Sequence, residues 1–274
     1  MDLEIDKILQ FLHMQKGYDF RGNHLPMLKR RVDKRVYATN TGSYEGYYIY
    51  LQKNQKELEE LFYVLTIHVS EFFRDPLVFE YLQSLISNTL EMKLRKGDYN
   101  LRIWSAGCAM GEEPYSIAIM MREILEKIVD SHITVDIIGT DIDEKILSRA
   151  VIGEYQEESL KSTRYGLVKK YFSQEDGHYA ISEDVKKMVS FSNYDLLDKK
   201  SFVPPESVFG DFDIVLCRNV LIYFNQEYQK GIFQKLYKSL HKNGYLVLGE
   251  SEIPIGEFSK KFKRVSGYCK IFQK

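Results

Sequence analysis

The spacing of apolar residues changes once along this chain, near Gly97, and that change limits the possible folds more than any other feature. Residues 1–94 carry apolar side chains at helical spacing, for example at Leu25 and Leu28. Beyond Gly97, short apolar segments typical of strands alternate with helical segments. Such alternation predicts an α/β sheet with helices on both faces. We therefore predict a helical N-terminal domain over residues 1–94 and an α/β domain over residues 95–274.

The predicted elements of the α/β domain follow a regular order. Strands are expected at Leu101–Trp104, Thr134–Gly139, Val189–Tyr194, Phe212–Cys217 and Tyr245–Gly249, with a last, antiparallel one at Val265–Phe272. Helices are expected at Glu113–Val129, Asp143–Ala150 and Gln226–Leu240, and the helix Pro76–Leu94 closes the N-terminal domain. One polar segment, about residues 155–188, contains Asp176-Gly177, which favours a hairpin turn. We expect this segment to form a small β-subdomain inserted in the α/β domain.

Charge and cysteine content exclude several classes of protein. The formal net charge is -1 at pH 7, so no global positive field favours nucleic acid as a partner. The three cysteines, Cys108, Cys217 and Cys269, lie far apart without CxxC spacing, which disfavours a disulfide framework or a metal site. The N-terminus does not resemble a secretory signal, and no apolar run reaches the roughly 18 residues that a membrane-spanning helix needs. We expect a cytoplasmic monomer that does not insert into a membrane.

The turn after the first predicted strand, Ser105–Gly111, has the composition of a ligand-binding loop. In doubly wound sheets the first strand-to-helix turn is a principal binding position, and small residues such as Gly107 let the backbone approach a ligand closely. Glu112 and Glu113 then open the helix. Two carboxylates there would repel a pyrophosphate, but they suit a positively charged ligand such as S-adenosylmethionine. We therefore expect S-adenosylmethionine to bind near Gly107, Glu112 and Glu113.

Polar residues also follow the next three predicted strands. Asp141 follows the second strand, where its carboxylate could accept hydrogen bonds from both ribose hydroxyls of the cofactor. Asp195 and Leu196 follow the third strand and could flank an adenine, and Arg218 and Asn219 follow the fourth. Because the carboxyl ends of parallel strands share one edge of a sheet, these residues should surround the same crevice as the loop.

The motifs alone leave other interpretations open. The loop could be a tight turn without a ligand, and Asp141 could be a helix N-cap, although Asp143 is the better N-cap candidate. A dinucleotide-dependent oxidoreductase would need GxGxxG, whereas this loop is GxxxG. A methyltransferase acting on nucleic-acid amino groups would usually carry (N/D/S)PP(Y/F) after the fourth strand, where this chain has Arg218–Leu221. A catalytically silent, cofactor-binding regulator is a further alternative.

Five segments of the sequence resemble those of the CheR-type methyltransferases, which methylate glutamates on chemotaxis receptors. The segments are TIHVSEFFRDP (66–76), WSAGCAMGEEPYSIA (104–118), GTDIDEKILSRAVIGEY (139–155), FDIVLCRNVLIYF (212–224) and LHKNGYLVLGESE (240–252). The resemblance implies a class I methyltransferase fold, a Rossmann-like doubly wound sheet, with a helical N-terminal domain and a small inserted β-subdomain. It also implies S-adenosylmethionine as cofactor, S-adenosylhomocysteine as product and receptor glutamates as methyl acceptors.

The resemblance also assigns roles to individual residues. It implies cofactor contacts at His68, Ser70, Arg74, Glu112 or Glu113, Asp141, Asp195, Leu196, Arg218 and Asn219. His68 stands where family members usually carry Asn, and Ser70 where many carry Thr. A glutamate acceptor has an unperturbed pKa of about 4.3 and is already ionised at neutral pH, so no general base is expected. Arg74 is the candidate for orienting a carboxylate, with a salt bridge to Asp75 or another acid as the structural alternative. Tyr223 could line the pocket or belong to the core.

Five cations crowd one predicted helix near the N-terminus: Lys29, Arg30, Arg31, Lys34 and Arg35. A run of charge is commonly a solvated helix face, but on a nearly neutral chain we interpret it as a docking patch for an acidic receptor helix bundle, the substrate that the resemblance implies. Some family members also grip a receptor pentapeptide through a longer, glycine-rich loop in the β-subdomain. This chain has the shorter Ser173–Tyr179 there, so we expect independence from the pentapeptide.

Overall fold

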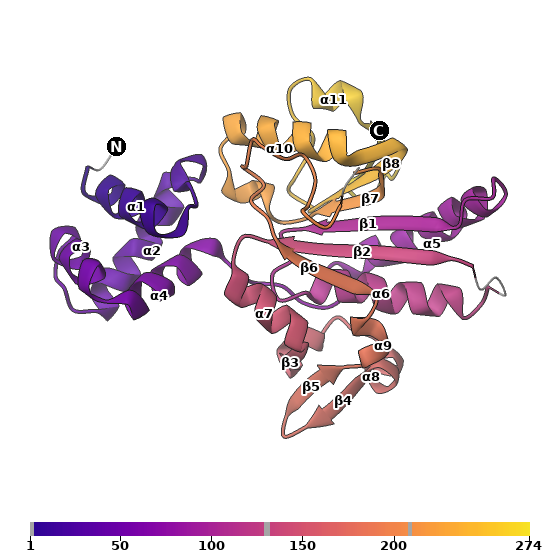
Figure 1. Ribbon diagram of the computed structural model, residues 1–274, viewed down its shortest axis with the longest axis horizontal. Helices are drawn as coiled ribbons and strands as arrows, with labels where there is room; N and C mark the ends of the chain where they lie inside the picture. The colour runs from indigo at the N-terminus through magenta and orange to yellow at the C-terminus, as the bar shows by residue number, and fades with distance from the viewer. Residues whose placement is uncertain (1–2, 129–131, 208–209) are drawn as a thin grey trace. The chain divides into compact units, whose positions relative to one another are not determined.

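The computed structural model describes residues 3–128, 132–207 and 210–274 (Figure 1). The chain forms two compact units. The first unit contains the N-terminal residues up to His68 and a later short segment, Ile222–Gln229. The second unit contains Val69–Leu221 and Lys230–Lys274. Each unit buries apolar side chains of its own.

The first unit is helical, as its apolar spacing predicts. Its helices are α1 (Leu3–Lys16), α2 (Leu25–Ala38), α3 (Tyr44–Lys53) and α4 (Gln55–Thr66), with a short 3-10 helix, η1 (Phe20–Gly22), after α1. The side chains of Ser43 and Asn54 accept hydrogen bonds from the backbone N–H groups of Gly46 and Glu57 and so cap α3 and α4. The buried apolar residues of the four helices include Ile5, Ile8, Leu12, Leu28, Val32, Tyr47, Leu51, Leu58 and Leu61.

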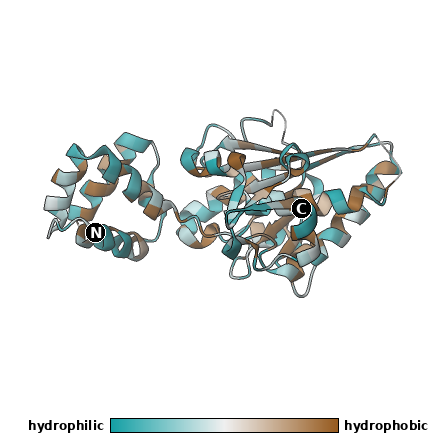
Figure 2. Ribbon diagram, turned by 90° about the horizontal axis from the view of Figure 1, so that it is seen from below, coloured by the Kyte–Doolittle hydropathy of each residue, from teal (hydrophilic) through white to brown (hydrophobic). Residues whose placement is uncertain are grey.

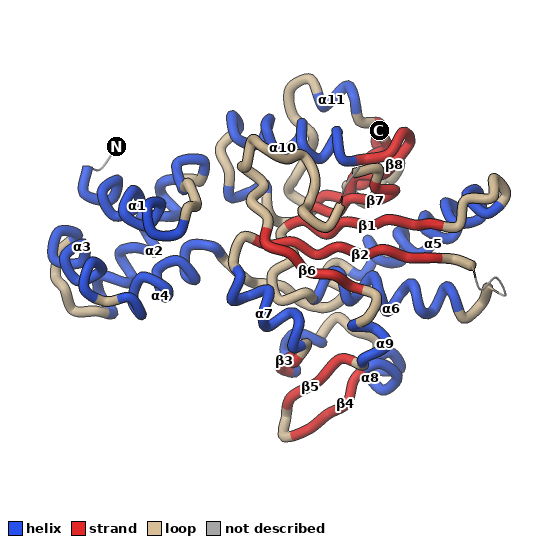
Figure 3. Tube along the Cα trace, in the orientation of Figure 1, coloured by secondary structure: helices blue, strands red, loops and turns tan. Residues whose placement is uncertain are grey.

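The second unit is built on a seven-stranded sheet in the order β6-β2-β1-β7-β8-β10-β9 (Figure 3). Its strands are β1 (Asn100–Ala106), β2 (Thr134–Asp141), β6 (Val189–Asn193), β7 (Phe212–Cys217), β8 (Leu240–Leu248), β9 (Lys263–Arg264) and β10 (Ile271–Gln273). The strands from β6 to β8 in this order are parallel, and β10 runs antiparallel to both β8 and β9. The order reverses between β1 and β7, which is the switch point at which doubly wound sheets bind ligands.

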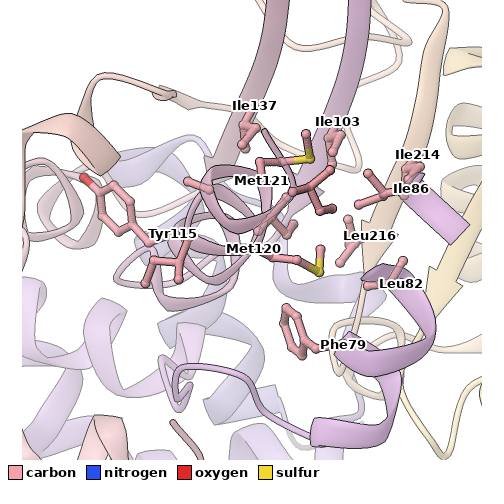
Figure 4. Close-up of a cluster of buried hydrophobic side chains, with 14 of the residues drawn as sticks. Phe79, Leu82, Ile86, Ile103, Tyr115, Met120, Met121, Ile137, Ile214 and Leu216 are labelled. Atoms are coloured by element: carbon pink, nitrogen blue, oxygen red, sulfur yellow. The ribbon is translucent and has the colours of Figure 1, made fainter. Parts of the chain in front are cut away.

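The helices that accompany this sheet are α5 (Pro76–Leu94), α6 (Glu112–Leu125), α7 (Glu144–Ile152), α10 (Gln226–Ser239) and α11 (Phe258–Lys261). Most of the 3-10 helix η3 (Leu221–Tyr223) and the first turn of α10 lie in the segment Ile222–Gln229, which belongs to the first unit. Helices of the protein carry both hydrophilic and hydrophobic residues (Figure 2). On one face of the sheet, Ile103 and Ile137 meet side chains of α5 and α6, among them Ile86 and Met121 (Figure 4). These residues form the main core of the second unit.

The opposite face of the sheet is covered as well. Trp104 follows Ile103 in β1 and therefore points to this other face, where its ring packs against those of Tyr194 and Phe212. Lys235 of α10 lies over the Tyr194 ring, which places α10 on the Trp104 side of the sheet. The sheet is thus buried on both faces, which confirms the predicted α/β class.

The predicted insertion is a small subdomain with its own sheet. It contains β3 (Glu154–Gln156), η2 (Glu157–Leu160), α8 (Tyr165–Tyr171), β4 (Phe172–Glu175), β5 (His178–Ile181) and α9 (Glu183–Lys186). The strand order is β3-β5-β4, and β4 and β5 pair antiparallel. Asp176 and Gly177, between them, both have positive φ, at 48° and 81°. This is the geometry that a two-residue type I′ hairpin requires, so the turn predicted from Asp176-Gly177 is confirmed.

Several sequence-based boundaries differ from the structure. Helix α5 belongs to the second unit, so the unit begins at Val69 and not at residue 95. The physical reason is that Phe79, Leu82 and Ile86 pack in the core of the sheet domain. Of the predicted last strand, Val265–Phe272, only Ile271 and Phe272 lie in a strand, β10, and β9 lies before the predicted range. The predicted strand Tyr245–Gly249 begins earlier, at Leu240, and forms β8. The predicted helix end at Val129 lies outside the described residues. Among the residues described, no helix combines the length and apolar character needed to cross a membrane.

We expect Ile86→Ala to lower the free energy of unfolding of the second unit by about 2–5 kcal/mol, because it empties a buried position between α5 and the sheet. Trp104 is the single tryptophan of the chain, so its fluorescence during urea unfolding reports on this unit. Met92→Ala, at an exposed position of the same helix, is the control and should shift the transition little. An unchanged transition in Ile86→Ala would contradict the assignment of α5 to this core.

Candidate active site

The loop after β1 is a tight turn built from left-handed residues. Gly107, Ala109 and Gly111 have φ values of 75°, 50° and 87°. A Cβ atom on Gly107 would lie 2.5 Å from a methyl carbon of Val220, and one on Gly111 would lie 2.9 Å from the Phe191 ring. The glycines are therefore required by packing within the protein, beyond any need to admit a ligand.

Glu112 is the first residue of α6, and its carboxylate is buried without a hydrogen-bond partner in the described structure. The residue is 0% exposed, and neither carboxylate oxygen receives a hydrogen bond. Burial raises the pKa of this carboxyl group to about 7. The backbone N–H of Glu112, the Ser70 hydroxyl and the Met110 backbone lie near the carboxylate and lower the pKa only in part, since none of them has the geometry of a hydrogen bond to it. Buried acceptors without a donor are rare in native proteins, so Glu112 is placed to receive a donor or cation from a ligand.

Glu113, by contrast, is engaged by the protein itself. One carboxylate oxygen accepts a hydrogen bond from the Ser105 hydroxyl at 2.7 Å, and the other accepts one from the Arg218 guanidinium at 3.1 Å. The sequence leaves open which of the two glutamates meets the cofactor. The geometry favours Glu112, because the Glu113 carboxylate already has two partners.

Arg218 joins the end of β7 to the segment before α5. Its side chain is only 2% exposed, and the guanidinium donates to the Arg74 carbonyl at 2.9 Å and to the Asp75 carboxylate at 2.7 Å. The guanidinium also lies over the Phe79 ring, 5.6 Å from its centroid. The resemblance implies that Arg218 contacts the cofactor, but most of its N–H groups donate hydrogen bonds to acceptors within the protein.

The segment that carries Arg74 is held in an unusual backbone conformation. Phe73 and Asp75 have φ values of 53° and 58°, a region that few residues other than glycine adopt. The Phe73 N–H donates to the Ser116 hydroxyl at 2.9 Å, which fixes the segment to α6. Arg74 itself is half-buried and donates to the Val69 carbonyl at 3.3 Å. Asp75 pairs with Arg218, and Arg74 has no salt bridge to Asp75 or to another acid among residues 3–128, 132–207 and 210–274, so the structural alternative predicted for Arg74 is not found there.

The sequence predicts two roles for the acids after β2, a helix N-cap and a contact with the ribose of the cofactor. The Asp143 side chain accepts hydrogen bonds from the N–H groups of Lys145 and Ile146 and so caps α7. Asp141, only 9% exposed, accepts a hydrogen bond from the Ala109 N–H at 3.0 Å with one oxygen. Its other oxygen accepts one from the Asp143 N–H at 3.1 Å. Asp141 therefore ties the end of β2 to the glycine loop.

The ends of β6 and β7 carry the remaining predicted residues. Asp195 accepts a hydrogen bond from the Leu197 N–H at 2.7 Å in a turn that contains the 9% exposed Leu196. Asn219 has a φ of 59°, and its N–H donates to the buried Glu252 at 2.9 Å. The four strand ends thus lie at the same edge of the sheet, since β6, β2, β1 and β7 are adjacent and parallel.

Glu252 is a structural residue of this edge that the sequence interpretation did not identify. Its two carboxylate oxygens accept hydrogen bonds from the N–H groups of Asn219, Leu221 and Gly249, at 2.9, 2.7 and 2.7 Å. One buried carboxylate therefore fixes the chain after β7 to the chain after β8. The available sequence signal was its position, because it follows the last parallel strand at the same edge.

Two predicted site residues, His68 and Tyr223, belong to the first unit. The His68 ring stacks on that of Tyr63, with the centroids 5.0 Å apart. The Tyr223 carbonyl accepts a hydrogen bond from the His24 N–H at 3.1 Å, and its side chain is half-buried. Within the first unit both residues therefore have local structural contacts.

The five cations of α2 separate into two groups. The Arg35 guanidinium binds both oxygens of Glu57, at 2.9 and 2.6 Å, and Glu57 also accepts a hydrogen bond from the buried Tyr47 hydroxyl. These contacts with Glu57 raise the pKa of Arg35. Arg31 donates to the Val64 carbonyl, and partial burial lowers its pKa. The exposed cations are Lys29, Arg30 and Lys34.

Two family models match this chain and together cover most of it. The model described as "CheR methyltransferase, all-alpha domain" matches residues 3–66, and the model described as "CheR methyltransferase, SAM binding domain" matches residues 68–271. The chain belongs to the CheR methyltransferase family. The change from one matched range to the other, between residues 66 and 68, lies within two residues of the end of the N-terminal part of the first unit, His68.

Several curated members of the CheR family are similar over nearly their full length. Chemotaxis protein methyltransferase 2 of Vibrio cholerae serotype O1 is 30% identical over 278 residues, which cover 98% of this chain and 93% of that protein. The chemotaxis protein methyltransferase of Listeria innocua serovar 6a is 34% identical over 254 residues, which cover 92% and 91%. The corresponding enzyme of Salmonella typhimurium is 29% identical over 257 residues, which cover 92% and 84%.

This CheR-family chain is a methyltransferase with S-adenosylmethionine as its cofactor. The residues at the edge of the sheet fit that cofactor. A buried carboxylate without a partner, Glu112, suits an ammonium group, and acids at the ends of β2 and β6 suit hydroxyl groups. The loop is GxxxG and its helix opens with two acids, so a pyrophosphate would meet repulsion here.

We expect cofactor binding to strengthen as the pH rises to about 7, the pKa to which burial raises Glu112. Below that pH, Glu112 carries a proton and cannot pair with an ammonium group, so affinity should fall by up to about tenfold per pH unit. Calorimetric titration of S-adenosylhomocysteine from about pH 5.5 to about pH 8 measures this slope. Glu112→Gln should weaken binding and abolish the slope, whereas Glu144→Gln, an exposed acid of α7, should leave both unchanged.

The same pKa has a second consequence, for the cofactor-free protein. Because the pKa of Glu112 is raised in the folded state, the folded protein retains a proton that the unfolded chain has lost. The free energy of unfolding should therefore fall as the pH rises from the ordinary glutamate pKa towards about 7.

A pH slope of cofactor binding that persists in Glu112→Gln would exclude Glu112 as its source.

Proposed function

We propose that this CheR-family protein transfers the methyl group of S-adenosylmethionine to glutamate carboxylates of chemotaxis receptors and so forms methyl esters. The observation that carries the proposal is that two features lie at helix α6. One is the buried carboxylate of Glu112, which has no hydrogen-bond partner among the described residues. The other is the segment Phe73–Asp75, which contains Arg74 and is fixed to α6 by a hydrogen bond to Ser116. The first suits the cofactor's ammonium group, and the second presents a guanidinium to a carboxylate. The names of the relatives, which are chemotaxis protein methyltransferases, support the receptor as substrate.

The proposed cofactor contacts follow from the chemistry of each strand end. Glu112 receives the ammonium group, with Ser70 beside it, and the small-residue turn at Gly107 faces the cofactor. Asp141 accepts hydrogen bonds from the ribose hydroxyls, and Asp195 and Leu196 flank the adenine. Asn219, at the end of β7, is also proposed to contact the cofactor. Arg218 and Glu113 form an ion pair within the protein and are proposed to shape the site without binding the cofactor directly.

The proposed chemistry is an in-line displacement at a methyl group that the sulfonium of the cofactor supplies. A glutamate carboxylate with a pKa of about 4.3 is ionised at neutral pH, so the protein has no proton to remove. Its contribution is to align the carboxylate and to exclude water from it. Arg74 is the proposed orienting group, since its guanidinium has one hydrogen bond, to the Val69 carbonyl, among the described residues.

His68 and Tyr223 remain proposed contributors from the first unit. His68 would donate a hydrogen bond to the cofactor from the position that Asn usually holds in the family. Tyr223 would line the pocket near the transferred methyl group. Both roles rest on the sequence motifs that contain them, TIHVSEFFRDP and FDIVLCRNVLIYF.

We expect Arg74→Ala to reduce methyl transfer to receptor by on the order of 10²-fold or more, because a fixed cation that orients the carboxylate is lost. Transfer from labelled cofactor to receptor-containing membranes is the measurement, with Trp104 fluorescence as the check of folding. Arg95→Ala removes an exposed arginine and is the matched control. Turnover of Arg74→Ala equal to that of the native protein would remove Arg74 from the mechanism.

The proposed receptor-docking patch is centred on the exposed cations of α2, Lys29, Arg30 and Lys34. The proposal includes Arg31 and Arg35 only as neighbours, because their guanidinium groups contact Val64 and Glu57 within the first unit. An acidic helical receptor bundle is the partner whose charge complements this face.

We expect the double variant Arg30→Glu/Lys34→Glu to lower kcat/KM for receptor by roughly tenfold at low salt, because rim charges act mainly on association. The effect should shrink as salt is added, while cofactor affinity stays unchanged. Lys53→Glu/Lys56→Glu introduces the same charge change at exposed positions of the same unit and should have little effect. Equal losses in the two double variants, or a native reaction indifferent to salt, would contradict a docking role for α2.

We also propose that receptor recognition does not depend on a C-terminal pentapeptide. The support is the short β4–β5 connection, a two-residue turn at Asp176-Gly177 with no glycine-rich extension. Binding of such a peptide with micromolar or tighter affinity would overturn this part. A cytoplasmic location and a monomeric state belong to the same proposal, and the free thiols of Cys108, Cys217 and Cys269 fit a reducing compartment.

A further inference from the structure

A buried lysine stands on the inward face of α10. Lys235 is 3% exposed and lies between Ile232 and Leu236, both of which are fully buried. Lysines are almost never buried to this extent without a partner, because removing an ammonium group from water is costly. The environment of Lys235 therefore needs a specific explanation.

The ammonium group of Lys235 binds the turn that follows β6. It donates to the Asp195 carbonyl at 3.1 Å and to the Asp198 carbonyl at 2.7 Å. It also lies over the ring of Tyr194, 4.4 Å from the centroid. All three contacts fall on one short segment, residues 194–198, so a single side chain of α10 holds both ends of this turn.

Hydrogen bonds within the turn at residues 194–198 and to the end of β2 fix its conformation. The Asp198 N–H donates to the Asp195 carbonyl at 3.0 Å and closes the turn, and the Leu197 N–H donates to the Asp195 carboxylate. At its start, the Tyr194 N–H donates to the Asp141 carbonyl at 3.0 Å. The segment is thereby fixed to the end of β2, and Leu196 is carried within it.

We propose that Lys235 is a positioning residue that holds the Asp195–Asp198 turn in the shape needed to bind the adenosine part of the cofactor. The inference rests on the proposed contacts of Asp195 and Leu196 with that part. Lys235 acts through the turn and is not proposed to touch the cofactor. A role confined to folding would be served as well by an apolar side chain of the same length, since buried charges seldom add net stability.

Because the ammonium group of Lys235 can lose a proton, the strength of its hydrogen bonds to the turn depends on pH. Burial lowers the pKa of Lys235 to about 8, although the carboxylates of Asp195 and Asp198 act in the opposite direction. The other titratable group against it, the Tyr194 phenol, has its pKa raised by burial and stays neutral in this range. As the pH rises through about 8, Lys235 loses its proton, and the charge-assisted hydrogen bonds to the turn weaken.

The test compares Lys235→Met with Lys230→Met, which removes an exposed lysine from the same helix. Calorimetric titration with S-adenosylhomocysteine at about pH 7 should show roughly tenfold weaker binding for Lys235→Met and no change for Lys230→Met. Methyl transfer at saturating cofactor should keep a kcat within about twofold of the native value, so the loss appears in KM. The Trp104 unfolding transition should remain close to that of the native protein.

The ratio of the Lys235→Met and native dissociation constants should be roughly ten at about pH 7 and should decrease as the pH rises through about 8, since a neutral Lys235 amine keeps its N–H donors but makes weaker hydrogen bonds to the turn. Glu112 and the cofactor titrate alike in both proteins, so this ratio isolates Lys235. Lys235→Gln provides a second neutral variant, and the same ratio should fall in the same way. Native affinity in these neutral variants, or a parallel loss of kcat and of folding stability, would overturn the inference. Absence of binding by the native protein would overturn the proposed cofactor site instead.

Discussion

The buried guanidinium of Arg218 is the interaction on which the rest of the site depends. It binds Glu113 at the start of α6 and both the carbonyl of Arg74 and the carboxylate of Asp75. These contacts keep a segment with positive φ angles in place. Only the contact with Glu113 is a buried ion pair, since the Asp75 side chain is partly exposed, and removing one partner of a buried pair typically costs about 3–5 kcal/mol. Because Glu113 is occupied in this way, Glu112 is the acid left to a ligand. One side chain thus orders both the proposed cofactor end and the proposed substrate end of the site.

Much of the fold follows from the sequence because its elements are short, strongly periodic and separated by recognisable turns. Phe212–Cys217 is apolar throughout and forms a central strand, and Asp176-Gly177 forms the predicted hairpin turn. The domain boundary was less accessible. Helical spacing shows that α5 has an apolar face, but it does not show which core receives that face, and Phe79 and Ile86 pack against the sheet. The segment between β9 and β10 contains Ser266-Gly267, and the Ser266 hydroxyl accepts hydrogen bonds from the N–H groups of Tyr268 and Cys269, a turn that the apolar spacing does not show.

The candidate site was predictable to the extent that strand ends must share an edge. Asp141, Asp195 and Asn219 were placed on that basis, and the sheet order brings their strands together. Which of these residues hold the protein together and which remain available to a ligand was not predictable, because this depends on contacts between residues far apart in the chain. Nothing local in the sequence shows that Glu252 binds three backbone N–H groups or that Arg35 binds Glu57. The same holds for Lys235, whose partner segment lies about forty residues away.

We propose that this edge of the sheet delivers a methyl group to a glutamate carboxylate of a receptor. The most direct measurement is to incubate the protein with methyl-labelled S-adenosylmethionine and chemoreceptor membranes and then to treat the labelled receptor with mild alkali. The account predicts label on the receptor that is released as methanol, because a carboxylate methyl ester hydrolyses under these conditions. Label that resists alkali, or cofactor that binds without any transfer to receptor, would contradict it.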